Sequence, residues 1–160
     1  MRSACHAENL RTAKPNDAGH LSDLYAEIFR KQWPRKDLEE RLKRKDSICY
    51  ILDLEDPGEL FGYLLAVNLI DSVEILSMGV TETRRCQGWA QRLMDRIVKD
   101  SSQSGISEIV LEVSETNAAA RGFYGKNGFV PVGRRPGYYR IEQSNGQFQR
   151  VDALILKRSV

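Results

Sequence analysis

The order of apolar patterns between residues 73 and 114 constrains the fold more than any other feature of the sequence. An apolar run covers Val73–Val80, a helical pattern begins at Gly88, and residues 107–114 alternate as in a strand. The helical stripe consists of Ala90, Leu93, Met94, Ile97 and Val98. A strand–helix–strand link is a crossover, and it makes the two strands parallel when they are neighbours in one sheet. The sequence therefore predicts one parallel strand pair.

Short strand and helix patterns alternate along the rest of the chain. Predicted strands cover residues 8–14, 47–54, 60–70, 130–143 and 147–157, and predicted helices cover 15–29, 36–43 and 117–127. A turn at Asp56, Pro57 and Gly58 joins two of the strands. We predict an α/β (α+β) fold with a central, mostly antiparallel mixed sheet of about six or seven strands and helices on both faces.

Local signals indicate where several of these elements begin and end. Asn117 is a favoured N-cap residue for the helix that follows it. Gly128 is well placed as a left-handed C-terminal cap of the same helix. Asn145-Gly146 predicts a type I′ turn in the last hairpin.

Composition narrows the class of protein. The chain has 160 residues, of which 41% are hydrophobic and 29% charged, so we expect one globular domain, 1–160. The net charge of +2 gives no indication of direct nucleic-acid binding. No apolar run approaches the roughly 18 residues of a membrane span, so we expect no membrane binding. The N-terminus shows no secretory pattern. Cys5, Cys49 and Cys86 lack paired or metal-ligand spacing, which predicts free thiols, no metal site and a cytoplasmic location.

The stretch Val80–Gln91 carries the strongest chemical signal. A strand ends, a short loop follows, and Gly88 opens a helix. Amides at a helix start lack partners within the helix and lie at the positive end of its dipole, so they can hold a pyrophosphate. Gly88 and Ala90 are small enough for a ligand to approach the backbone. Taken alone, small residues at a helix start more often reflect ordinary packing.

The loop resembles a known motif. Residues 85–90, Arg-Cys-Gln-Gly-Trp-Ala, are similar to the Q/R-x-x-G-x-G/A motif of the GNAT acetyltransferases. Downstream, residues 111–113, Asn117, residues 118–120, Tyr124 and residues 128–129 resemble the LEV…N…A…Y…GF series of the RimI-type ribosomal-protein-alanine acetyltransferases. The resemblance extends over roughly residues 8–157. Cys86 and Gln91 stand where that type often has arginine.

This resemblance implies acetyl-CoA as co-substrate and a set of residues that bind it. The implied cofactor-binding residues are Met78, Gly79, Val80, Arg85, Cys86, Gln87, Gly88, Trp89, Ala90, Gln91, Asn117 and Tyr124. The implied substrate-binding residues are Trp33, Tyr138 and Tyr139. The Val80 amide would also help to hold an oxyanion.

Two residues are candidates for acid–base chemistry. Glu112 lies on the strand face opposite Ile109, Leu111 and Val113, where a carboxylate is either exposed, ion-paired or functional. The resemblance implies that it is the general base, acting through a water. Tyr124 is either a core aromatic residue or, as the resemblance implies, the acid that protonates the departing sulfur.

The expected function is acetyl transfer to the N-terminal amine of a protein, with the N-terminal alanine of a ribosomal protein as the acceptor that the resemblance implies. Acetylation of a small amine or amino acid is the first alternative. A non-catalytic acyl-CoA-binding module is the second, although Glu112 and Tyr124 together speak against it. Residues 30–46, with many basic side chains, form either a solvated helix face or a surface that steers acidic or RNA-rich partners.

Overall fold

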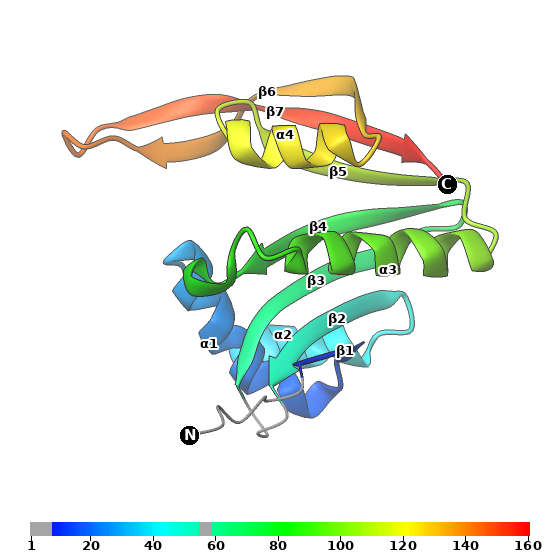
Figure 1. Cartoon of the computed structure of the whole chain (residues 1–160). Helices are drawn as coiled ribbons and strands as arrows, with labels where there is room; N and C mark the ends of the chain where they lie inside the picture. The colour runs from blue at the N-terminus through cyan, green and yellow to red at the C-terminus, as the bar shows by residue number, and fades with distance from the viewer. Residues whose placement is uncertain (1–7, 55–58) are drawn as a thin grey trace.

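The computed structural model describes residues 8–54 and 59–160, so the predicted turn at 56–58 lies outside the described residues. Within them the chain forms one seven-stranded sheet with helices packed on it (Figure 1). The strands are β1 (Glu8–Thr12), β2 (Ser47–Leu54), β3 (Leu60–Asn68), β4 (Ser72–Val80), β5 (Glu108–Ser114), β6 (Val130–Glu142) and β7 (Phe148–Ser159). The helices are α1 (Ala18–Phe29), α2 (Arg35–Lys43), α3 (Trp89–Gln103) and α4 (Ala118–Lys126), with short 3₁₀ turns at Pro15–Asp17 and Glu82–Arg84.

The sheet order confirms the predicted crossover. The strands lie in the order β1-β2-β3-β4-β5-β7-β6, and β4 and β5 run parallel while the other neighbours are antiparallel. The link between β4 and β5 runs through α3, which is the helix that begins after Gly88. The predicted mixed α/β fold is therefore the observed one.

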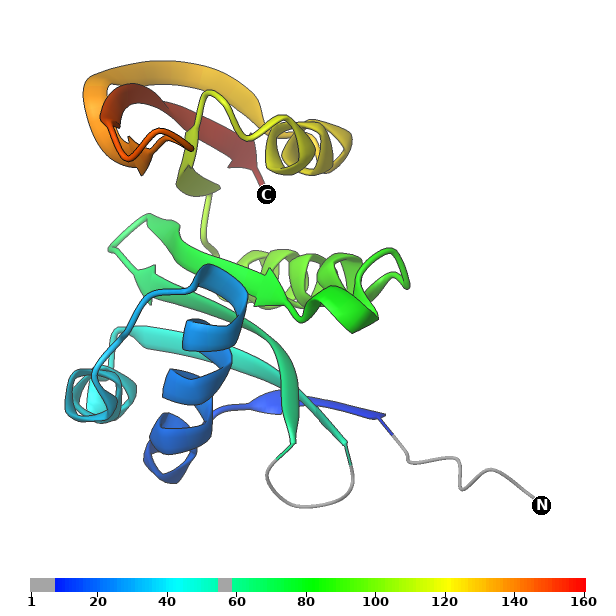
Figure 2. The same ribbon diagram turned by 90° about the vertical axis from the view of Figure 1, so that its left-hand side faces the viewer.

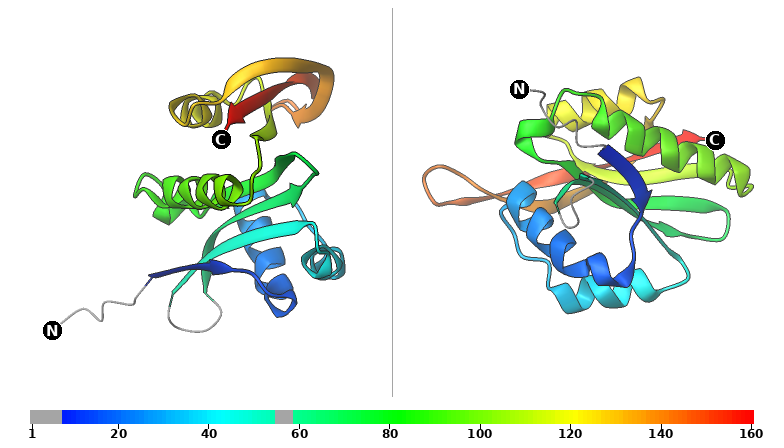
Figure 3. Two further views of the ribbon diagram at one scale, coloured as in Figure 1. Left: turned by 90° about the vertical axis from the view of Figure 1, so that its right-hand side faces the viewer. Right: turned by 60° about the horizontal axis from the view of Figure 1, so that its bottom comes forward.

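Each face of the sheet is covered by its own pair of helices. Helices α1 and α2 lie on one face, and α3 and α4 lie on the other (Figures 2 and 3). Along β2, Tyr50 and Leu52 belong to the apolar cluster under α3, whereas Cys49 and Ile51 belong to the cluster under α1 and α2. Successive side chains of a strand point to opposite faces, and helices cover both faces of this sheet. Strands β2 and β3 are therefore apolar almost throughout.

The parallel pair separates part-way along its length, and a β-bulge marks the place. Pairing runs from Ser72↔Glu108 to Ile75↔Leu111 and then stops, although both strands continue. At that point the register of β3 against β4 skips Leu76. A bulge bends its strand and increases the local twist, so β4 turns away from β5 beyond Ile75.

The last two strands form a long hairpin, as predicted, but the predicted type I′ turn is wrong. A type I′ turn needs positive φ at both central residues, and of Asn145 and Gly146 only Gly146 has one, at 75°. The Gly146 amide donates to the Gln143 carbonyl at 2.9 Å, and the Gln143 amide donates to the Gln147 carbonyl at 2.8 Å. These bonds close a three-residue loop in which glycine takes the left-handed position after the turn.

Helix α4 has both of its predicted caps. The Asn117 side chain accepts a hydrogen bond from the Ala120 amide at 3.1 Å. At the other end Gly128 has φ 79°. Its amide donates to the Gly125 carbonyl, and the Phe129 amide donates to the Tyr124 carbonyl, both at 3.1 Å. This pair of bonds is the Schellman motif, which satisfies the free carbonyls of a helix end.

Candidate active site

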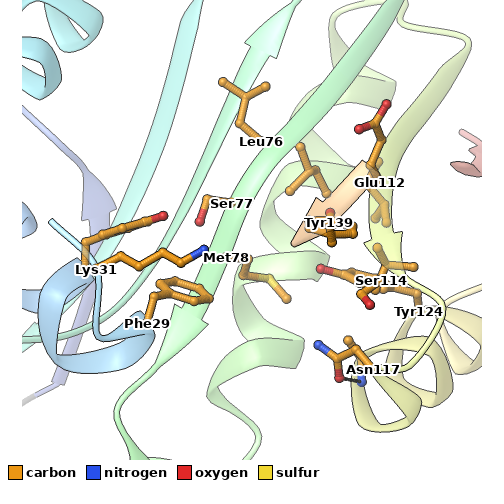
Figure 4. A pocket seen from close by; sticks show the side chains of 15 residues that line it. Phe29, Lys31, Leu76, Ser77, Met78, Glu112, Ser114, Asn117, Tyr124 and Tyr139 are labelled. Atoms are coloured by element: carbon orange, nitrogen blue, oxygen red, sulfur yellow. Dashed lines mark hydrogen bonds between the residues drawn. The ribbon is translucent and has the colours of Figure 1, made fainter. Parts of the chain in front are cut away.

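The gap between β4 and β5 holds a cavity of about 370 Å³, which we call the split cavity (Figure 4). One wall comes from α1 and the chain after it, the floor comes from β4, and the opposite wall comes from β5, α4 and β6. The lining residues are Tyr25, Phe29, Lys31, Ile75, Leu76, Ser77, Met78, Leu111, Glu112, Val113, Ser114, Asn117, Ala120, Tyr124 and Tyr139. Because α1 and α4 lie on opposite faces of the sheet, the split cavity can be approached from both.

Strand β4, the floor, presents backbone groups to the cavity. The Thr81 amide donates to the Phe61 carbonyl of β3 at 2.8 Å. In an antiparallel ladder alternate residues bond the same neighbour, so Gly79 and Thr81 face β3, and Met78 and Val80 face the gap that β5 has left. The Val80 carbonyl accepts a hydrogen bond from Arg85 Nε at 3.2 Å. The Val80 amide faces the gap, as the register requires.

A second hollow, of about 560 Å³, adjoins the start of α3, and we call it the loop groove. It is lined by Val80, Arg84, Arg85, Cys86, Gly88, Trp89, Ala90, Gln91, Ala118, Ala119, Gly122, Phe123 and Lys126. Cys86 and Gly88 both have positive φ, 59° and 85°, so the chain turns sharply just before the helix. The first amides of α3 have no partner within the helix and lie at its positive end.

The loop groove fits a pyrophosphate with an attached pantetheine arm. A Cβ placed on Gly88 would meet no atom within 4 Å, and the same holds for Gly122 inside α4. A glycine inside a helix costs about 0.5–1 kcal/mol relative to alanine, and Gly122 has no protein neighbour that would explain it. Arg84, Arg85 and Lys126 supply positive charge even though residues 86 and 91 are uncharged. The open space beside both glycines leaves room for a ligand to approach the backbone.

Glu112 projects from β5 into the split cavity and is ion-paired. Its side chain is 16% exposed, and its Oε1 lies 2.8 Å from Nε of Arg135 on β6. The strand alternates as the sequence predicts, with Ile109, Leu111 and Val113 buried on the other side. The ion pair offsets the cost of partly burying the carboxylate.

Tyr124 lines the same cavity from α4, between Phe123 and Phe129. Burial, with a smaller contribution from Tyr139, raises the pKa of the Tyr124 hydroxyl to about 12. The phenol therefore stays protonated at every physiological pH and can only donate or accept as a neutral group. Figure 4 shows Tyr124, Tyr139 and Asn117 grouped on one wall of the cavity.

Comparison with known proteins agrees with this geometry. The family model of the acetyltransferase (GNAT) family matches residues 19–129, which is most of the chain. The chain belongs to the GNAT acetyltransferase family. A Bacillus subtilis protein named as a ribosomal protein bS18-alanine N-acetyltransferase is 26% identical over 156 residues, covering 98% of this chain and 96% of the relative.

Solved structures of the family have the same fold. The Escherichia coli ribosomal-protein-S18-alanine N-acetyltransferase superposes with a TM-score of 0.83 at 19% identity, covering 96% of this chain and 94% of the other. Arabidopsis thaliana NAA60 in complex with acetyl-CoA gives 0.80 at 24% identity, covering 96% and 99%. Acetyl-CoA is the acetyl donor of GNAT enzymes, and this chain is an acetyltransferase of that family.

Some residues expected to bind the acetyl donor have a structural role in this GNAT domain. A side chain on Gly79 would press on Ile28 of α1 at 3.0 Å, so helix packing alone requires this glycine. The Trp89 ring is buried against Phe61, with ring centroids 5.1 Å apart, so only its backbone is available to a ligand. Gln91 donates to Asn127 at 2.7 Å and to Asp95 at 2.8 Å, which joins α3 to α4.

The remaining expected residues lie in or beside the two hollows. Gln87 donates to the Thr83 carbonyl at 3.1 Å and braces the loop. Trp33 packs against Tyr25 with ring centroids 5.1 Å apart, and Tyr25 rather than Trp33 lines the split cavity. Tyr139 lines the cavity, whereas Tyr138, 51% exposed, packs edge-on against Tyr139.

Several residues that line the two hollows were not predicted from the sequence. Phe29, Lys31 and Leu76 line the split cavity, and Phe29 and Leu76 are unusually exposed for apolar residues. Gly122 and Lys126 line the loop groove. A glycine in the middle of a helical pattern is the one available signal, because the other residues reach the site only through the tertiary fold.

Two of the expectations from the sequence concern metal sites and membrane spans. Among residues 8–54 and 59–160 no three His, Cys, Asp or Glu side chains are grouped so that they could hold a metal ion. In the same part of the chain no helix is long and apolar enough to cross a membrane. Cys49 is buried and Cys86 is exposed, and both are free thiols, while Cys5 lies outside the described residues.

Proposed function

We propose that this enzyme transfers the acetyl group of acetyl-CoA to the N-terminal amine of a protein, with the N-terminal alanine of a ribosomal protein as acceptor. The observation that carries the proposal is the split cavity, because it is lined by elements from both faces of the sheet and by Glu112 and Tyr124. A donor along the loop groove and an acceptor from the α1 side would meet there. The names of the bS18-alanine relatives support alanine as the first residue of the acceptor.

Each wall has a distinct part in the proposed reaction. Acetyl-CoA supplies the acetyl thioester. The amides of residues 86–91 hold its pyrophosphate, and the Met78 and Val80 main chain pairs with the arm and with the thioester oxygen. Glu112 accepts the proton of the acceptor amine, directly or through one water, and the Tyr124 hydroxyl donates a proton to the departing sulfur.

An N-terminal amine suits this site better than a lysine. An α-amino group has a pKa of about 7.7–8.0, against about 10.4 for lysine, so far more of it is neutral at physiological pH. A single partly exposed carboxylate is then a sufficient base. The apolar rim formed by Phe29 and Leu76 is suited to a small apolar first residue such as alanine. Ribosomal proteins are made in the cytoplasm, and we place the reaction there.

A peptide panel tests the proposal. Purified enzyme is incubated with acetyl-CoA and four acceptors: a peptide with a free N-terminal alanine, the same peptide with a blocked α-amine and a free lysine, free alanine, and a polyamine. Mass spectrometry should find the acetyl group on the α-amine of the first peptide, with the other acceptors far slower. Faster turnover of free alanine or the polyamine would make the protein a small-amine acetyltransferase instead. Acetyl-CoA binding without turnover of any acceptor would indicate a non-catalytic module.

A further inference from the structure

Glu112 forms an ion pair with Arg135, a residue that the sequence patterns did not single out. Nε of Arg135 lies 2.8 Å from Oε1 of Glu112, and the two side chains are 55% and 16% exposed. Within the described residues no hydrogen bond to Oε2 of Glu112 is found. One oxygen of the carboxylate is thus held, and the other is free to accept.

An irregularity in β6 places Arg135. The register runs from Arg135↔Ala153 to Tyr139↔Val151, so residues 136–138 of β6 face a single residue of β7, Asp152. Asp152 anchors this bulge by accepting from the Gly137 amide and from Arg134, both at 2.8 Å. Bulges re-aim side chains, and here the bulge follows directly after Arg135.

A tyrosine of the bulge supports the guanidinium. The Arg135 guanidinium carbon lies 5.3 Å from the centroid of the Tyr138 ring, within the range of a cation–π contact. Tyr138 packs edge-on against Tyr139, which lines the split cavity. Arg135 is therefore fixed on two sides, by the ring of Tyr138 and by the carboxylate of Glu112.

We propose that Arg135 is the positioning residue of the base: it orients Glu112 so that Oε2 faces the acceptor amine. This inference rests on the proposed function, because it takes Glu112 to be the base. Arg135 does not touch the acceptor or the acetyl donor. It acts through Glu112 alone.

The other charged groups near Glu112 do not take over this role. Tyr124 on α4 and Tyr139 on β6 line the same cavity, and burial, with a contribution from Glu112, raises the pKa of Tyr139. On β7, Lys157 pairs with Glu108 at 3.0 Å. The wall opposite β5 carries Lys31, and β4 contributes no ionisable side chain to the cavity. In the described part of the chain, Arg135 is thus the cation in direct contact with the base.

Four variants test the inference: Arg135→Gln, Arg135→Lys, Glu112→Gln and the double variant Arg135→Gln/Glu112→Gln. At saturating acetyl-CoA and peptide, Arg135→Gln should lower kcat roughly 10- to 100-fold. It should have no further effect in the Glu112→Gln background. Arg135→Lys should restore only part of kcat, because lysine lacks the planar donor geometry.

The outcomes are separable. Arg140→Gln is the matched control, since Arg140 is on the same strand and packs over Phe148 at 3.8 Å; it should leave kcat unchanged. An Arg135→Gln defect that is equal in both backgrounds overturns the inference while leaving the proposed function intact. A Glu112→Gln variant as fast as the parent overturns the base assignment itself, and with it the inference.

Discussion

The two hollows of this enzyme are built in different ways. The loop groove is lined by one strand–loop–helix segment and by α4, and five of its residues are glycine or alanine, which leave the backbone accessible. The split cavity is built of side chains from α1, β4, β5, α4 and β6, which lie far apart in the sequence. A site made of backbone leaves a short sequence motif, whereas a site made of side chains is assembled only by the tertiary fold. Substitutions should therefore act on binding in the first region and on chemistry in the second.

The largest expected effect is on chemistry in the split cavity. Glu112→Gln keeps the shape of the side chain but removes the proton acceptor, so kcat at neutral pH should fall about 10²- to 10⁴-fold. The loss should shrink above the pKa of the acceptor amine, about 8, where neutral amine is plentiful. The measurement is kcat across pH 6–10 at saturating substrates.

Glu108→Gln is the matched control for that experiment. Glu108 is on the same strand and the same face and is also ion-paired, to Lys157, but it does not line the split cavity. Its kcat should stay at the parental value. Equal losses for Glu108→Gln and Glu112→Gln would mean that β5 charge in general, and not the base, supports the rate.

Gly88→Val should produce the next largest effect, on binding in the loop groove. The new side chain would project into open space that the pyrophosphate would occupy, so acetyl-CoA affinity should fall about 30- to 100-fold, or roughly 2–3 kcal/mol. Isothermal titration calorimetry measures the loss. Gly105→Val is the control, because Gly105 also has positive φ, 72°, and an open Cβ position but lies outside the groove. Both variants should lose similar stability from backbone strain, and affinity falling equally in both would remove the loop from the site.

Tyr124→Phe should lower kcat about tenfold with little change in acetyl-CoA affinity, because it removes one hydrogen bond to a developing charge. Since the pKa of Tyr124 is raised to about 12, the parent enzyme should show no loss of rate from phenol ionisation below about pH 10. Steady-state kinetics over pH checks both statements. Tyr50→Phe is the control: it removes a 2.7 Å hydrogen bond to Asp100, so it should lower stability and leave kcat unchanged. Weakened acetyl-CoA binding in Tyr124→Phe would make the tyrosine a packing residue.

The smallest effect joins the two regions through α4. Gly122→Ala and Gly125→Ala both place a methyl group in open space within the helix, so each should raise the free energy of unfolding by about 0.5–1 kcal/mol. Gly122 lines the loop groove and Gly125 does not. Gly122→Ala alone should also weaken acetyl-CoA binding a few-fold. Thermal melts with and without acetyl-CoA measure both quantities, and equal ligand stabilisation of the two variants would show that α4 does not contact the donor.

The contrast between the regions also explains which sequence predictions were confirmed. Asn117 caps α4, Gly128 closes it and Gly88 directly precedes α3, as expected, because each depends on the backbone of a few adjacent residues. The turn at residues 144–146 was predicted wrongly although it is also local. Its type depends on how the two strands pair on either side, and the dipeptide Asn145-Gly146 does not determine that pairing.

The sequence by itself determined the family, the crossover and the backbone loop, because strand and helix periodicities and glycine positions are local properties of the chain. Only the tertiary structure decided that Gly79 makes room for Ile28, that Trp89 belongs to the core, and that Gln91 bonds Asn127. It also brought Arg135 to Glu112 across 23 positions of sequence, by way of a bulge in β6 that Asp152 holds. Contacts of this kind arise from strand register and splay, which are set by the whole sheet, so no short stretch of residues encodes them.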